Sequence, residues 1–135
     1  MTTKGIEAIA SDIHIIKKHT CPSLSHQSTL TYEIGRTSNS DLLIRIIKNS
    51  GTGKFNSDWI SVSTILDLIE KTESPFNSSI LTCLYERKSL NSAGFLLSAL
   101  QKEELVQPTE QGGYRRTDKS IKDFQRKSRS RRTKS

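Results

Sequence analysis

The sequence predicts an α+β fold in which an N-terminal helix and a three-stranded antiparallel sheet precede three helices, a β-hairpin and a disordered basic tail. Three observations carry this prediction. Apolar and polar residues alternate around residue 32, as in a half-buried strand. From residue 61 the apolar residues recur at helical spacing. Ten of the 21 Lys and Arg residues lie at or after Arg115. We therefore divide the chain into residues 1–60, 61–118 and 119–135.

Residues 1–60 are expected to form a packing or dimerisation unit. Isoleucines at positions 6, 9, 13 and 16 would share one face of a helix from about Thr3 to Lys18. After a loop, alternating apolar and polar residues mark a strand at 30–35. Turn-forming sequences then separate this strand from two more, which we expect at residues 42–47 and 55–60.

Residues 61–118 are expected to begin with three helices. Apolar residues at positions 62, 65, 66 and 69 form a stripe behind Ser61, whose hydroxyl can cap a helix that runs to Thr72. Asn77 and Asn91 are placed to cap a second and a third helix. In the third helix the buried stripe is Ala93, Leu96, Leu97 and Leu100, which leaves Asn91, Ser92, Ser98 and Lys102 facing outward.

A glycine-tipped hairpin completes this part of the chain, with its turn at Gln111-Gly112-Gly113 and a return through Tyr114 to Thr117. The order of three helices and a hairpin is that of a winged helix. The sequence from Ser92 to Val106, followed by the Gly-Gly turn, resembles the recognition helix, joint and wing of bacterial winged-helix regulators. The resemblance covers about residues 61–118.

In the winged-helix class the third helix usually enters the major groove of DNA, and the wing contacts the backbone. The resemblance therefore implies that polar and basic residues of this region contact DNA. We expect Asn91, Ser92, Ser98 and Lys102 to contact bases or phosphates. Arg87 and Lys88 would contact phosphates at the preceding turn, and Arg115 and Arg116 would contact phosphates beside the wing.

The tail holds the positive charge of the protein. The chain has a formal net charge of +7, yet Met1 to Tyr114 carries 11 basic and 12 acidic residues, so this body is nearly neutral. A basic segment with little apolar surface to bury is suited to bind a polyanion, of which nucleic acid is the commonest. We expect phosphate contacts from its eight cations: Lys119, Lys122, Arg126, Lys127, Arg129, Arg131, Arg132 and Lys134.

These observations predict a small DNA-binding regulator of transcription or replication, whose tail supplies affinity and whose partner is duplex DNA. The alternative is an adaptor: its winged-helix module and N-terminal sheet would bind another protein or a second copy, and its tail would contact RNA or act as a targeting signal. DNA binding implies a cytoplasmic protein at the nucleoid, or a nuclear one in a eukaryotic host.

Other classes of function find little support in the sequence. No catalytic constellation stands out, so we expect neither an enzyme nor a cofactor. His14, His19, Cys21 and His26 lie close together, but their spacing is not that of a known zinc finger, and we expect no metal site. We expect two reduced thiols, with Cys83 buried. No apolar run approaches the roughly 20 residues that cross a bilayer, so no membrane contact is expected.

Overall fold

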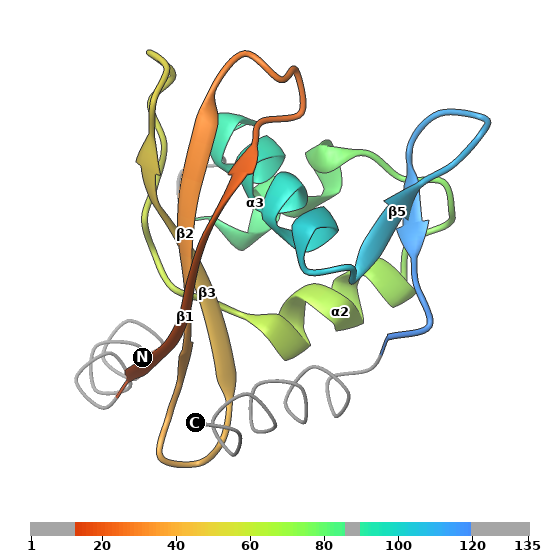
Figure 1. Cartoon of the computed structure of the whole chain (residues 1–135). Coiled ribbons are helices and arrows are strands. Elements are labelled where there is room, and N and C mark those ends of the chain that lie inside the picture. The colour runs from red at the N-terminus through yellow and green to blue at the C-terminus, as the bar shows by residue number, and fades with distance from the viewer. Residues whose placement is uncertain (1–12, 86–89, 120–135) are drawn as a thin grey trace.

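The computed structural model describes residues 13–85 and 90–119, which form an α+β fold of two layers. A four-stranded antiparallel sheet in the order β1-β2-β3-β4 lies on one side, and the helices lie together on the other (Figure 1). A two-stranded hairpin, β5–β6, follows the last helix (Figure 1). The elements are β1 His14–Pro22, β2 Thr29–Arg36, β3 Leu42–Asn49, β4 Ile60–Ser61, α2 Val62–Glu70, the 3₁₀ helix η1 Ser78–Leu84, α3 Leu90–Lys102, β5 Val106–Pro108 and β6 Tyr114–Arg116.

The prediction of an N-terminal helix followed by three strands is wrong where the structure describes it. The described chain starts with a strand, β1, which pairs with β2 from His14↔Arg36 to Pro22↔Thr29. The helical spacing was misleading because Ile13 and Ile16 serve opposite faces of the sheet: Ile16 packs against the core, whereas Ile13 lies over Gly35 on the outer face. Residues 3–12 of the expected helix lie outside the described residues.

The two central strands were predicted correctly, but the strand expected at 55–60 is almost absent. Only Ile60 and Ser61 pair, with Ile44 and Leu43 of β3. The preceding segment is held instead by side chains of α3. Ser92 Oγ accepts a hydrogen bond from the Asn56 N–H at 2.6 Å, and Asn91 Nδ2 donates one to the Lys54 carbonyl at 3.0 Å. These contacts satisfy backbone groups that a strand would otherwise have paired.

The helices follow the expected order with differences at their ends. Ser61 caps α2 as predicted, because its Oγ accepts a hydrogen bond from the Thr64 N–H at 3.3 Å. Asn77 likewise caps the second helix, which is the 3₁₀ helix η1 rather than an α-helix. The third helix, α3, starts at Leu90 and includes Asn91, so Asn91 is not its cap. The turn before it, residues 86–89, lies outside the described residues.

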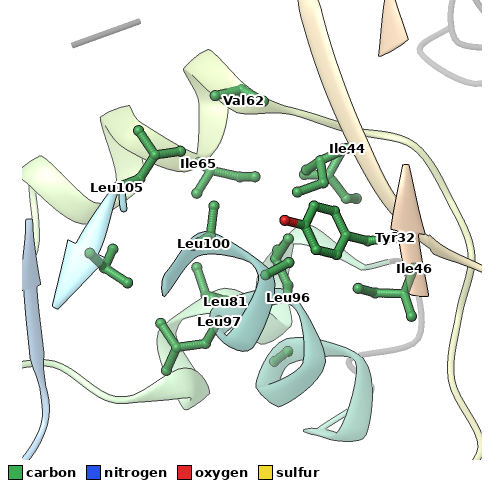
Figure 2. Close-up of a cluster of buried hydrophobic side chains, with 14 of the residues drawn as sticks. Tyr32, Ile44, Ile46, Val62, Ile65, Leu81, Leu96, Leu97, Leu100 and Leu105 are labelled. Atoms are coloured by element: carbon green, nitrogen blue, oxygen red, sulfur yellow. The ribbon is translucent and has the colours of Figure 1, made fainter. Parts of the chain in front are cut away.

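One core joins the sheet to the helices. Figure 2 shows Tyr32, Ile44 and Ile46 pointing from the sheet toward the side chains of α2, η1 and α3. All four members of the stripe predicted for α3 are buried. Burial of such side chains is the main favourable term in folding, so neither layer can separate without exposing it. Fully buried large side chains are Leu30, Tyr32, Ile34, Ile44, Ile46, Ile65, Leu81, Leu96, Leu97, Leu100 and Leu105.

The predicted hairpin is confirmed in the pairing of β5 with β6. Its turn passes through Gly112 and Gly113, both at positive φ (90° and 83°). The hairpin is fixed to the chain before η1, because Phe76 and Tyr114 exchange backbone hydrogen bonds of 2.9 and 2.7 Å.

We expect Gly113→Ala to destabilise the protein more than Gly112→Ala. Positive φ costs an L-residue about 1–2 kcal/mol at either site. A Cβ at Gly113 would also lie 2.9 Å from the Phe76 carbonyl oxygen and from Pro75 Cβ, whereas one at Gly112 would meet nothing within 4 Å. Urea unfolding should show about 1 kcal/mol lost for Gly112→Ala and about 2–3 kcal/mol for Gly113→Ala. Equal losses would contradict the crowding at Gly113.

Candidate functional site

Helix α3 is enclosed by the rest of the protein, which changes the role expected for it. Each residue from Ser92 to Leu100 is buried or half-buried. Ser92 is 0% exposed and Ser98 is 4% exposed, so the expectation that both face outward is wrong. Ser92 binds the Asn56 N–H, and Ser98 Oγ donates a hydrogen bond to the Gly94 carbonyl at 3.2 Å. A helix that reads bases must present exposed side chains to the major groove. Ser92 and Ser98 are buried and therefore cannot contact bases there.

The two other expected reading residues are exposed at opposite ends of α3. Asn91 is exposed, but its amide nitrogen is bonded to the Lys54 carbonyl. Lys102 is exposed in the last turn of the helix, beside the exposed Gln101. Several expected site residues lie outside the described part of the chain: Arg87, Lys88, Lys122, Arg126, Lys127, Arg129, Arg131, Arg132 and Lys134.

The returning strand of the hairpin brings three basic residues to the surface around the end of α3. Arg115 is exposed. Arg116 Nη1 lies 2.7 Å from Glu70 Oε2, and its Nη2 donates to the Lys119 carbonyl at 2.8 Å. Lys119 Nζ in turn donates to the Glu103 carbonyl at 2.7 Å. Lys119, at the end of the described chain, is therefore held next to the C-terminal end of α3.

A buried ionic cluster lies directly beneath this point. Lys17 Nζ is 2.8 Å from Glu103 Oε1, and the two side chains are only 7% and 4% exposed. The Tyr32 hydroxyl donates a short hydrogen bond to Glu103 Oε2. Glu103 thus connects β1, β2 and the end of α3. This cluster was not predicted, because Lys17 was assigned to a helix from about Thr3 to Lys18. An inward Lys17 becomes apparent only once β1 is known to be a strand.

Burial perturbs the pKa values of two acids close to this cluster. The pKa of Tyr32 is raised well above its ordinary value, first by burial and then by its hydrogen bond to Glu103. Burial also raises the pKa of the Cys21 thiol to about 11, an effect that the Lys102 charge opposes. Both groups are therefore neutral at physiological pH. They place uncharged side chains next to the Lys17–Glu103 ion pair.

The cluster of histidines and Cys21 does not come together as a metal site. Within residues 13–85 and 90–119, no group of three or more His, Cys, Asp and Glu side chains is arranged to hold a metal ion. His14 and His26 are exposed at different places on the sheet layer, whereas Cys21 is buried. Cys83, expected to be buried, is exposed on η1.

Two hollows adjoin each other at the end of α3. The first, about 480 Å³, lies between the loop after β1, the last turn of α3 and the hairpin, and His26, Lys102 and Tyr114 line it. The second, about 400 Å³, shares Gln101, Glu104 and Pro108 with the first and reaches Lys119. Tyr114, Gln101 and His26 line the first hollow, and none of the three was predicted to contact nucleic acid.

Comparison with known proteins gives no family for this chain. No protein-family model, curated protein sequence or solved structure matches it. In the part of the chain that the structure describes, no helix is long and apolar enough to cross a membrane.

We expect Glu103→Gln to lower the free energy of unfolding by about 3 kcal/mol, because it leaves the buried Lys17 ammonium without a counter-charge. Urea denaturation of Glu103→Gln, Lys17→Met and the double variant measures this. The double variant should cost clearly less than the sum of the single losses, since it buries no unpaired charge. Additive losses would contradict the ion pair.

We expect the two cysteines to differ sharply in reactivity. At pH 8 the exposed Cys83 should react rapidly with a disulfide reagent, whereas Cys21 is buried and its pKa is about 11, so that little thiolate forms. The same raised pKa implies that stability is retained below pH 9 and falls as pH rises toward 11, because the unfolded thiol loses its proton first. A Cys83→Ser variant that still showed a fast thiol would contradict this.

Proposed function

We propose that the protein binds nucleic acid through phosphate contacts made by its C-terminal residues, and that it acts as a small DNA-binding regulator of transcription or replication. The observation that carries this proposal is the fixed start of the basic segment. Lys119 is held on the Glu103 carbonyl beside the exposed Arg115. Residues 120–135 then add seven Lys and Arg residues against one Asp. Clustered cations of this kind bind phosphates and release counterions.

The proposal does not depend on base reading by α3. Phosphate contacts position a protein on nucleic acid but carry no sequence information. Because Ser92 and Ser98 are buried, the described surface offers few groups that could read base edges. We therefore propose sequence-tolerant binding, with the winged-helix resemblance limited to the order of helices and hairpin. A location at the nucleoid, or in the nucleus of a eukaryotic host, follows from the same proposal.

A second candidate function, protein binding, is favoured by one feature of the sheet. Ile15 is 47% exposed on the outer face, which the described helices leave uncovered. Contact with a protein partner or a second copy of the chain would remove this apolar surface from water. In that case the basic segment would serve as an RNA contact or a targeting signal.

The test of the main proposal is a salt titration of binding to a labelled DNA duplex. If six to eight cations contact phosphates, affinity should fall by about three to five decades between ~50 and ~200 mM salt. Deletion of residues 120–135 should remove most of the affinity and flatten the salt dependence. A matched control that shuffles the order of these residues should bind like the parent chain, because charge and not sequence sets the affinity.

Two results would decide against this proposal. One is the absence of duplex binding by the full chain at ~50 mM salt. The other is undiminished binding after replacement of the seven cations by glutamine. The protein-binding candidate would be favoured if cells that carry the variant with seven glutamines keep the phenotype of the parent protein, whereas cells that carry Ile15→Glu lose it.

A further inference from the structure

The two hollows at the end of α3 adjoin each other, and we call the two together the groove. Gln101, Glu104 and Pro108 line both hollows. One end of the groove lies at His26 and Lys102, and the other at Lys119. Residue 120, at which the cation-rich sequence begins, follows Lys119 directly.

The groove combines an aromatic surface with polar and cationic groups. Tyr114 is half-buried and pairs across the hairpin with Pro108, and both line the first hollow. Lys102 and Gln101 are exposed at its edge, on the last turn of α3. Cys21 and Ser98 contribute buried, uncharged side chains, whereas Glu104 supplies one negative charge. The volume of the first hollow, about 480 Å³, falls within the range of about 300–1,000 Å³ typical of small-molecule sites.

This combination matches what a single strand of nucleic acid requires. Proteins bind single strands by stacking unpaired bases on aromatic rings and by running the backbone along cationic groups. In a duplex the faces of the bases are covered by their neighbours, so a stacking ring selects for single strands. Tyr114 offers the ring, Lys102 the charge, and Gln101 hydrogen-bonding groups for a base edge.

We propose that this groove binds a short stretch of single-stranded nucleic acid, with a base on the Tyr114 ring and a phosphate at Lys102. The inference rests on the proposed function, because residues 120–135, which follow Lys119 in the sequence, would hold the neighbouring phosphates. It adds a selectivity that the segment alone lacks: single strands over duplex.

The test compares a labelled oligothymidylate of about twelve nucleotides with a duplex of equal phosphate count, by fluorescence anisotropy on the full chain. Tyr114→Leu should weaken single-strand binding about tenfold, while Tyr114→Phe, which keeps the ring, should bind like the parent. Neither change should alter duplex binding. Since Tyr114 also packs against the core, unfolding curves of both variants must match that of the parent.

Lys102→Gln provides a second test at an exposed position. It should reduce the slope of log affinity against log salt by about 0.7 for the single strand, as expected for one lost phosphate contact. Lys48→Gln is the matched control, because Lys48 is exposed on β3 and lines neither hollow, and its slope should stay unchanged.

The outcomes separate this inference from the proposed function. Unchanged single-strand binding in Tyr114→Leu and Lys102→Gln, with binding still dependent on residues 120–135, overturns the groove and leaves the proposed function intact. Tighter single-strand binding after deletion of residues 120–135 overturns both, because both expect that segment to add affinity. No binding of either nucleic acid at ~50 mM salt overturns both.

Discussion

The burial of α3 is the constraint on which the rest of the structure depends. This helix lies between the sheet and η1, and it supplies Leu96, Leu97 and Leu100 to the shared core (Figures 1 and 2). Its polar residues also bind other parts of the protein. Ser92 and Asn91 hydrogen-bond to the segment before β4. Glu103, directly after the helix, pairs with Lys17 and accepts a hydrogen bond from Tyr32. Residues 92–100 of the helix therefore cannot form a free recognition surface, and only its ends are exposed.

The residues expected to supply affinity for nucleic acid and those expected to supply selectivity consequently belong to different parts of the chain. Ten of the 21 Lys and Arg residues lie at or after Arg115, whereas the described body contributes a groove lined by Tyr114, Lys102 and Gln101 among others. Charge alone binds any polyanion, and discrimination needs shape or stacking. The hairpin joins the two functions, because Tyr114 faces the groove and the same strand leads through Arg115 and Arg116 to Lys119.

Elements with strong local signals could be predicted from the sequence. The alternation in β2, the apolar stripe of α2 behind Ser61 and the glycine-tipped hairpin each reflect an interaction between near neighbours. The predictions that were wrong concern segments whose structure depends on residues far away in the sequence. Isoleucines 13 and 16 mimic a helical stripe although they lie on opposite faces of the sheet, and the segment before Ile60 is held by α3 instead of a strand. The groove combines three separate regions and has no local signature.

The ion pair between Lys17 and Glu103 has a consequence for how the protein is made. Its partners are 86 positions apart, and Tyr32 and Glu103 are 71 apart. During synthesis from the N-terminus, β1 and β2 are made long before Glu103. Until Glu103 is added, the inward-facing Lys17 ammonium and Tyr32 hydroxyl lack the Glu103 carboxylate. Contacts at such separation slow folding and lengthen the time for which a nascent sheet exposes its apolar face. Residues 103–106, directly after α3, therefore complete these contacts during synthesis, and chains that stall before them are the ones most exposed to aggregation.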